Sequence, residues 1–167
     1  MKQAKVLTDK ELKKVISYID AFDRHAERNK AIVRLTYCLG LRISECASLL
    51  LTDVVNDEGT VNDVIHLSVE QTKGNKSRRV FVSKKAKSAL KQYLQSDLSV
   101  IQHTYLFQTQ KSKRFNTNAL TQLVKRLYDR VGVVGASSHS GRRTFITKLA
   151  TSGVSVRVIA EAVGHSS

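Results

Sequence analysis

Apolar residues recur at helical spacing along most of this sequence, and this periodicity limits the possible folds more than any other feature. The first run begins at Thr8, which forms a capping box with Glu11, and extends to about Asp20. Gly40 and several later glycines stand at positions where helices commonly stop. Further helices are expected over residues 24–39, in a short segment capped by Ser44, and over residues 84–95, 116–132, 139–153 and 155–163.

One segment departs from the helical pattern. Residues 64–69 read as a strand and residues 79–82 as its antiparallel partner, joined by a basic loop that contains Gly74. A chain of 167 residues is long enough to bury a core, and one domain is the default at this length. The sequence therefore predicts a mainly α fold with a small antiparallel β-sheet (α+β), in a single domain over residues 1–167.

The last two predicted helices carry apolar residues that are expected to face the core. In the first of them these residues are Phe145, Ile146, Leu149 and Ala150, and in the second they are Val158, Ile159 and Ala162.

Positive charge is concentrated in the second half of the chain. The net charge is +14; residues 1–83 hold 14 basic and 11 acidic side chains, whereas residues 84–167 hold 14 basic and 3 acidic ones. A basic half on a folded domain favours a polyanionic partner, and double-stranded DNA is a better explanation than solubility alone. Candidate DNA contacts in the loops and on the helix after residue 139 are Lys76, Arg78, Lys113, Arg114, Ser140 and Arg143.

His139 and Arg142 form the central motif. They are three residues apart at the head of a predicted helix, so they share one helix face. An imidazole beside a forked guanidinium suits a phosphate oxyanion. Taken alone, a pattern this short is more often a solvated helix start. Gly141, between them, is expected to let the backbone approach a neighbouring element closely.

Arg42 lies in the elbow between two predicted helices, flanked by Leu41 and Ile43. A partly buried guanidinium needs a partner, and Glu45, three residues on, can supply a carboxylate. This segment supports two interpretations equally: a purely structural ion pair, or a carboxylate that steadies a functional arginine.

Several other classes of protein are disfavoured. Cys38 and Cys46 match no common zinc spacing, the histidines form no metal motif, and neither a metal nor another cofactor is expected. Both thiols are expected to be buried in a reducing cytoplasm. No apolar run approaches the length needed to span a membrane, so no membrane association is expected.

Four motifs in series resemble the catalytic domain of the tyrosine recombinases, the phage integrase family. They are Gly40–Glu45, Thr72–Gly74 on the predicted hairpin, His139–Thr144 and Gly164–Ser167. The resemblance covers nearly the whole chain and implies the fold of that catalytic domain. It implies metal-free cleavage and rejoining of DNA, in which a tyrosine attacks the phosphodiester to give a 3′-phosphotyrosyl intermediate and a free 5′-hydroxyl.

The resemblance also assigns roles to residues. Arg42 and Arg142 would clamp the non-bridging phosphate oxygens, and Lys73 would protonate the leaving 5′-oxygen. His139 would assist proton transfer at the nucleophile, and His165 would donate a hydrogen bond to the phosphate. Glu45 would support Arg42 as a neighbouring carboxylate.

Two departures from the family pattern are expected to matter. The family's nucleophilic tyrosine follows the Gly164–His165 motif, and none of the five tyrosines in this sequence occupies that position. The chain is therefore expected to be truncated before its nucleophile and inactive by itself. It also lacks the separate DNA-clamping (core-binding) domain that usually precedes the catalytic one.

Two other functions remain possible from the sequence: a type IB topoisomerase-like enzyme and a DNA-binding module without catalysis. The resemblance implies a bacterial or phage-encoded protein in the cytoplasm, associated with the nucleoid and belonging to a mobile element. It further implies a homotetramer on DNA for the complete protein, while a chain that ends at Ser167 is expected to be a monomer.

Overall fold

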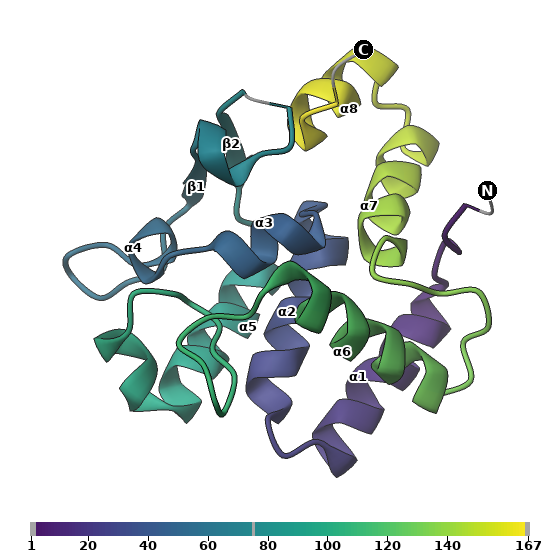
Figure 1. Ribbon diagram of the computed structural model, residues 1–167. Coiled ribbons are helices and arrows are strands. Elements are labelled where there is room, and N and C mark those ends of the chain that lie inside the picture. Colours follow the sequence, from purple (N-terminus) through teal and green to yellow (C-terminus); the bar gives the residue numbers. More distant parts are fainter. Residues whose placement is uncertain (1–2, 75, 166–167) are drawn as a thin grey trace.

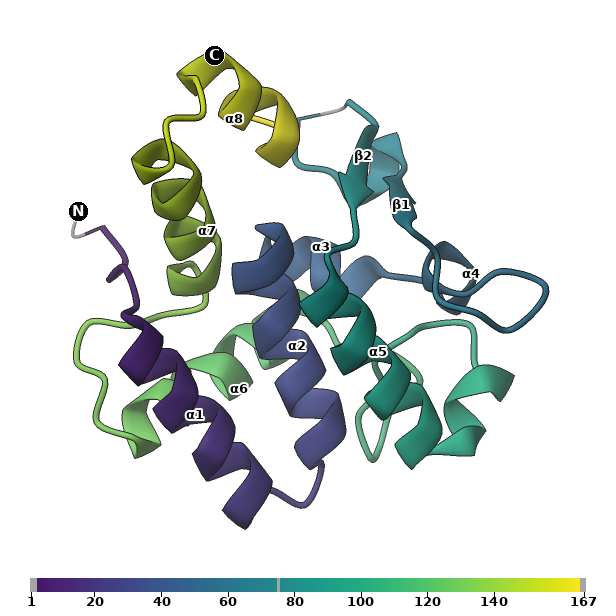
Figure 2. The same ribbon diagram turned by 180° about the vertical axis from the view of Figure 1, so that it is seen from behind.

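The computed structural model describes residues 3–74 and 76–165, which form a mainly helical fold with one two-stranded sheet (Figures 1 and 2). The predicted mainly α fold with a small antiparallel sheet is confirmed. The elements are α1 (Asp9–Phe22), α2 (Ala26–Leu39), α3 (Ile43–Ser48), α4 (Leu51–Val54), β1 (Val64–Leu67), the 3-10 helix η1 (Val69–Gln71), β2 (Arg78–Phe81), α5 (Lys84–Ser96), the 3-10 helix η2 (Leu98–Gln102), α6 (Thr117–Arg130), α7 (Ser140–Thr151) and α8 (Val156–Val163).

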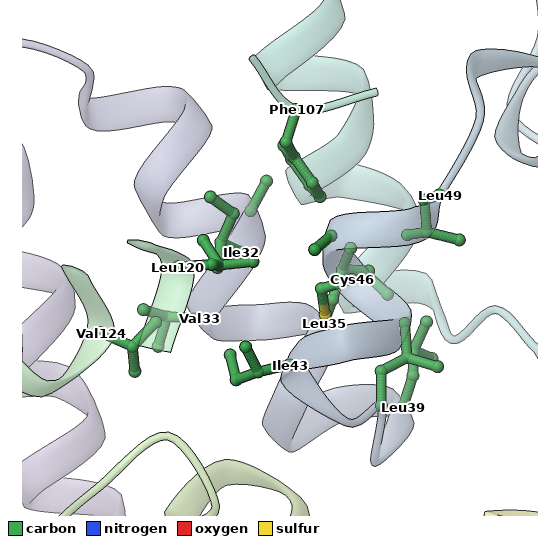
Figure 3. Packing of buried hydrophobic residues seen from close by; sticks show 14 of the residues in the cluster. Ile32, Val33, Leu35, Leu39, Ile43, Cys46, Leu49, Phe107, Leu120 and Val124 are labelled. Carbon is green, nitrogen blue, oxygen red and sulfur yellow. The ribbon is translucent and has the colours of Figure 1, made fainter. Parts of the chain in front are cut away.

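Helix α2 is central, with α1, α3, α5 and α7 packed around it. Its apolar side chains meet those of α3, α6 and the segment after η2 in one core cluster (Figure 3). Burying each large aliphatic side chain contributes roughly 1.5–3 kcal/mol, so this cluster supplies much of the stability. The labelled residues of the cluster are Ile32, Val33, Leu35, Leu39, Ile43, Cys46, Leu49, Phe107, Leu120 and Val124.

Local capping signals place the helix starts. The Thr8–Glu11 capping box is present at α1, and the side chains of Ser83 and Asn116 accept N–H bonds at the starts of α5 and α6. The prediction for Ser44 is wrong, because α3 begins at Ile43 and its N-cap is Arg42, two residues before Ser44. There the Glu45 carboxylate accepts the Arg42 N–H at 2.8 Å, so the cap comes from within the helix.

The sheet is an antiparallel pair in which Ile65 lies opposite Val80 and Leu67 opposite Arg78. These four residues point to one face, since side chains two apart on a strand share a face. Ile65, Leu67 and Val80 are buried on it. Arg78 therefore belongs to the inward face of β2, not to the connecting loop where the sequence analysis placed it.

The expected inward faces of α7 and α8 are confirmed only in part: Ile159 is buried, and Phe145, Ile146 and Leu149 are half-buried. The buried face of α7 is formed by Ser140, Gly141, Arg142 and Thr144, while Ala150 is exposed. On α8, Ile159 and Val163 are buried, but Val158 and Ala162 are exposed. The apolar pattern did not identify the fully buried face of α7, because small and hydrogen-bonded polar residues let this helix pack tightly against α2.

Across residues 3–74 and 76–165, none of the helices combines the length and apolar character needed to cross a bilayer.

Candidate active site

The elbow between α2 and α3 positions Arg42. Gly40 ends α2 in the left-handed conformation, with φ of 71°, and a Cβ at this position would lie 2.5 Å from the Phe145 ring of α7. The chain then turns through the buried residue Leu41 to Arg42, whose side chain is 20% exposed. The guanidinium of Arg42 is thus held near the surface by an elbow that is itself buried.

Glu45 is the carboxylate at the centre of the site, and its side chain is fully buried. It accepts the backbone N–H of Arg42 at 2.8 Å and the Arg42 Nη1 at 3.4 Å. It also forms a two-pronged ion pair with Arg78, in which Nη2 lies 3.0 Å from Oε1 and Nη1 contacts Oε2. A buried carboxylate is costly unless it is paired, and two guanidiniums offset that cost here.

Arg142 lies in the first turn of α7 and is buried. Its Nη1 donates to the Gly40 carbonyl at 2.8 Å, and its Nη2 donates to the Val163 carbonyl at 2.7 Å. These bonds join the end of α2 to the end of α8. Burial, and next the positive charge of Arg42, lower the pKa of Arg142 to about 10. The guanidinium therefore stays charged at neutral pH.

Gly141 explains how α7 reaches this position. A Cβ at Gly141 would lie 1.9 Å from Oγ1 of Thr36 on α2, closer than any side chain can come. The expected close backbone approach is confirmed, and the neighbour is α2.

His165 follows the Gly164 turn at the end of α8, and its backbone N–H bonds the Ala160 carbonyl at 2.9 Å. The His165 side chain is exposed, but the atoms around it remove part of its hydration, and this desolvation, and next the positive charge of Arg142, lower the pKa of His165 from its ordinary value. Arg42 and Arg78 act in the same direction. The imidazole thus belongs to the same cationic cluster and is favoured in its neutral form.

The predicted catalytic set is only partly assembled. Contacts and electrostatic coupling bring together Arg42, Glu45, Arg142 and His165. Lys73 lies on the exposed turn after η1, and His139 is the exposed N-cap residue of α7. Within the described parts of the chain, neither of these two side chains has a hydrogen-bond or ion-pair partner.

The candidate DNA contacts lie in different surroundings. Lys76 is exposed, whereas Ser140 is fully buried and its hydroxyl accepts the Ser137 N–H at 3.0 Å. Arg143 is half-buried on α7. A DNA contact through the Ser140 hydroxyl would require it to leave this buried bond, while Lys76 is open to solvent.

The basic loop before α6 belongs to another part of the surface. Lys113 lines a cavity of about 730 Å³ at the start of α2, together with Arg24 and Arg28. Arg114 is exposed and lies over the Tyr105 ring at 4.9 Å. This loop is therefore at the opposite end of α2 from Arg42.

Arg78 belongs to the site, although the sequence predicts it as a DNA contact in the hairpin loop. Its side chain is only 6% exposed and is bound to Glu45. A period-two pattern carried the signal, since Arg78 is in phase with the buried residues Val80 and Val82.

Comparison with known proteins gives a consistent result. Residues 5–167 match the phage integrase family. The tyrosine recombinase XerC of Thermodesulfovibrio yellowstonii is 34% identical over 150 residues, which cover 84% of this chain and 47% of the relative. Transposase A from transposon Tn554 of Staphylococcus aureus is 33% identical over 177 residues, covering 99% of this chain and 46% of the relative. The chain thus spans about half the length of these relatives.

Solved structures share the fold along the whole chain. The crystal structure of XerA recombinase has a TM-score of 0.81 and 28% identity, and the match covers 100% of this chain and 58% of that one. The XerH site-specific recombinase bound to its difH substrate has a TM-score of 0.74 and 24% identity, with 99% and 49% covered, which is a likeness of fold. A match from residue 5 to residue 167, joined to this shared fold, leads to one conclusion: the chain belongs to the phage integrase family.

Proposed function

We propose that this chain is the catalytic domain of a site-specific DNA recombinase that cleaves and rejoins strands through a 3′-phosphotyrosyl intermediate. The observation that carries the proposal is the convergence of Arg42, Arg142 and His165 where α2 and α8 end and α7 begins. Guanidiniums fixed by backbone and carboxylate contacts are preorganised donors for phosphate oxygens, and they need no rearrangement as charge develops.

In the proposed reaction a tyrosine oxygen bonds to phosphorus as the bond to the 5′-oxygen breaks. Arg42 and Arg142 bind the non-bridging oxygens, and each is worth roughly 3–4 kcal/mol of transition-state stabilisation if it acts like a single oxyanion donor. Phosphoryl transfer mostly requires such positioned charge. The neutral imidazole of His165 donates one N–H to the phosphate.

Lys73 and His139 complete the proposed proton transfers. Both are exposed, so both can meet a DNA strand that lies over the two arginines. Lys73 gives its proton to the leaving 5′-oxygen, and His139 takes the proton of the tyrosine hydroxyl. The same groups act in reverse when the 5′-hydroxyl attacks and the strand is resealed.

The nucleophile is proposed to be a tyrosine that follows His165 in the whole protein. The tyrosines within the chain are poorly suited to attack. Burial raises the pKa of Tyr37, Tyr93 and Tyr128, which disfavours the phenolate, and the Tyr93 hydroxyl donates to the Leu106 carbonyl at 2.8 Å. The hydroxyls of Tyr18 and Tyr105 accept bonds from Arg130 and Arg114.

Double-stranded DNA is the proposed partner, as the basic second half favours. Solved relatives of the same fold include the Tn1549 transposon integrase in complex with transposon end DNA and XerH bound to difH. A homotetramer on DNA, a separate clamping domain in the whole protein and an association with the nucleoid stay predictions.

The function can be tested by trapping the covalent intermediate. The whole protein is incubated with a nicked duplex that carries its recombination site, and a DNA adduct that shrinks on protease treatment is expected. Arg142→Ala should reduce adduct formation by about 100- to 1,000-fold, as for loss of one oxyanion donor. Lys148→Ala is the matched control, because Lys148 lies exposed on the same helix and pairs with Asp9.

Other outcomes would contradict the proposal. No adduct with any nicked or Holliday-junction substrate would exclude a tyrosine recombinase. Relaxation of arbitrary supercoiled plasmid without recombination would favour the topoisomerase-like alternative. DNA binding and function in the cell that survive Arg42→Ala would favour a non-catalytic binding module.

A further inference from the structure

Arg78 makes contacts that neither a DNA-binding residue nor a simple surface arginine would make. Its guanidinium engages both carboxylate oxygens of Glu45, with Nη2 at 3.0 Å from Oε1 and Nη1 on Oε2. The same two oxygens also accept from Arg42, Oε1 from its backbone N–H and Oε2 from its Nη1. Arg78 therefore fixes the plane of the carboxylate that in turn holds Arg42.

A second contact joins Arg78 to the turn before His165. A Cβ on Gly164 would lie 3.0 Å from Cδ and 3.2 Å from Nη1 of Arg78, so the arginine packs directly against this glycine. Helix α8 accordingly lies beside the loop end of β2 in both views (Figures 1 and 2). A side chain at residue 164 would be strained at a φ of 71° and would push the Arg78 side chain away from this turn.

The position of Arg78 in the chain adds a third connection. It opens β2, five residues after Lys73, on the strand that leaves the connecting loop. Its side chain points to the inward face of the sheet, next to Leu67, while Lys73 stays exposed. One side chain thus links the hairpin of the proposed general acid to the supports of Arg42 and of His165.

We propose that Arg78 is a positioning residue for strand cleavage. It holds the Glu45 carboxylate in the orientation that fixes Arg42, and its contacts with the hairpin and with the Gly164 turn keep both segments next to the same phosphate. This inference rests on the proposed function, in which Arg42 and Arg142 bind the reacting phosphate. A forked guanidinium is required, because a lysine at residue 78 could carry the charge but could not hold both carboxylate oxygens in one plane.

The test compares two neighbouring arginines on one strand. Arg78→Lys keeps the charge and removes the fork, and Arg79→Lys makes the same change at the next residue, which is exposed. Each 167-residue protein is titrated with inorganic phosphate while the Nε–Hε NMR signals of Arg42 and Arg142 are followed. Arg78→Lys should weaken phosphate binding at Arg42 about tenfold, as expected for coupled neighbours, and Arg79→Lys should stay within about twofold.

The order of the Arg42 guanidinium in the phosphate-free protein is a second measurement, made by ¹⁵N relaxation at Nε. Positioning by Arg78 requires Arg42 to become more mobile in Arg78→Lys and not in Arg79→Lys. If wild-type Arg42 and Arg142 bind no phosphate but this mobility difference is found, the proposed function fails and the positioning role stands. If neither phosphate affinity nor Arg42 mobility responds to Arg78→Lys, the positioning role is overturned.

A double variant separates positioning from a merely structural ion pair and covers the case in which a single variant unfolds. Arg78→Met leaves the buried Glu45 carboxylate with Arg42 as its one remaining cationic partner among the described residues, at 3.4 Å, whereas Arg78→Met with Glu45→Gln removes that charge and should recover most of the thermal stability. A structural pair predicts that phosphate affinity at Arg42 recovers with stability. The positioning role requires stability to recover while the affinity stays at least about fivefold below wild type.

Discussion

Two glycines decide how the arginine site is assembled at the scale of single residues. Gly141 brings α7 against Thr36, and Gly40 accommodates the Phe145 ring at the elbow that leads to Arg42. Both contacts lie between α2 and α7, the pair of helices that carry the two arginines to the site. The distance between Arg42 and Arg142 is therefore controlled by positions where no side chain fits.

The first prediction concerns Gly141. In Gly141→Ala the new Cβ would lie 1.9 Å from Oγ1 and 2.6 Å from Cβ of Thr36, so α7 must shift away from α2. Overpacking of this kind should lower the free energy of unfolding by about 1–3 kcal/mol, measured by urea denaturation. The change should also reduce adduct formation more than stability alone accounts for, because Arg142 moves with the helix.

Gly74→Ala is the control, because a Cβ there meets no atom within 4 Å and φ lies outside the positive region. Its effect on stability should stay below about 0.5 kcal/mol. Thr36→Ala should restore part of the loss when combined with Gly141→Ala, since it removes the hydroxyl that the new methyl group meets. If Gly141→Ala and Gly74→Ala lower the free energy of unfolding equally, the close contact between Gly141 and Thr36 does not contribute to stability.

The second prediction concerns the charge state of His165. Neighbouring positive charge disfavours the imidazolium, so an NMR titration should place the midpoint of His165 below 6.5, its ordinary value. Arg42→Gln should raise this midpoint, whereas Arg157→Gln, on the exposed side of α8, should leave it unchanged. Because the folded pKa is the lower one, protonating His165 favours unfolding, and its effect on stability should set in as the pH falls below 6.5. A midpoint above 6.5 would contradict the clustering of these cations.

Residue-scale features were predictable where their cause is local in the sequence. Thr8, Ser83 and Asn116 cap the helices they precede because each cap needs only an N–H three residues on. Ser44 failed as a cap, since Glu45 performs the same task from inside α3. The predicted pairing of Glu45 with Arg42 is confirmed, with Arg42 Nη1 at 3.4 Å from Oε2. The second partner, Arg78, could not be predicted, because it is 33 residues away and reaches Glu45 through the packing of the sheet.

Helix α7 shows what element-scale reasoning from apolar periodicity leaves out. Its inward face is made of small and polar side chains, and these satisfy one another through hydrogen bonds. The Thr144 hydroxyl donates to the Ser140 carbonyl at 2.7 Å and accepts the buried N–H of Leu7 at 2.8 Å. A polar face can be buried when every group is paired, which a hydrophobic pattern cannot indicate.

The third prediction follows from this pairing. Thr144→Val keeps the shape of the side chain but leaves the Leu7 N–H without its acceptor, which should cost about 1–3 kcal/mol of unfolding free energy. Thr147→Val, at an exposed position on the same helix, is the matched control and should change stability by less than about 0.5 kcal/mol. Amide hydrogen exchange at Leu7 should also become faster in Thr144→Val alone. Unchanged exchange there would mean that this bond does not hold the segment before α1 to α7.

At the scale of the whole molecule, the site exists because segments far apart in sequence end at one place. Arg42 precedes α3, Arg78 opens β2, Arg142 lies in the first turn of α7 and His165 follows α8; Figure 1 shows β2, α7 and α8 arranged around α3. The motifs predicted that such residues belong together through the family resemblance. Their physical connection, through Glu45 and the carbonyls of Gly40 and Val163, depends on tertiary packing and is visible only in the structure.

The fourth prediction concerns how the basic half of the molecule meets DNA. Each protein–phosphate contact releases counterions, so the affinity for duplex DNA should fall steeply as the salt concentration rises. In a plot of log affinity against log salt concentration, each contact should contribute a slope of magnitude about 0.9. Lys113→Gln with Arg114→Gln removes two charges from the loop at the far end of α2, and it should reduce that slope by about two if both contact phosphates.

Lys10→Gln with Lys14→Gln is the charge-matched control, since both lysines are exposed on α1 in the half of the chain that is nearly balanced in charge. This pair should leave the slope unchanged and weaken binding only slightly, through the lower net charge. Equal slopes in the two double variants would show that the loop before α6 does not touch the duplex. A slope reduced by about two in the loop variant alone would mean that the bound DNA reaches from the arginine site to the basic loop. These two places are separated by the length of α2, about 21 Å at 1.5 Å per residue.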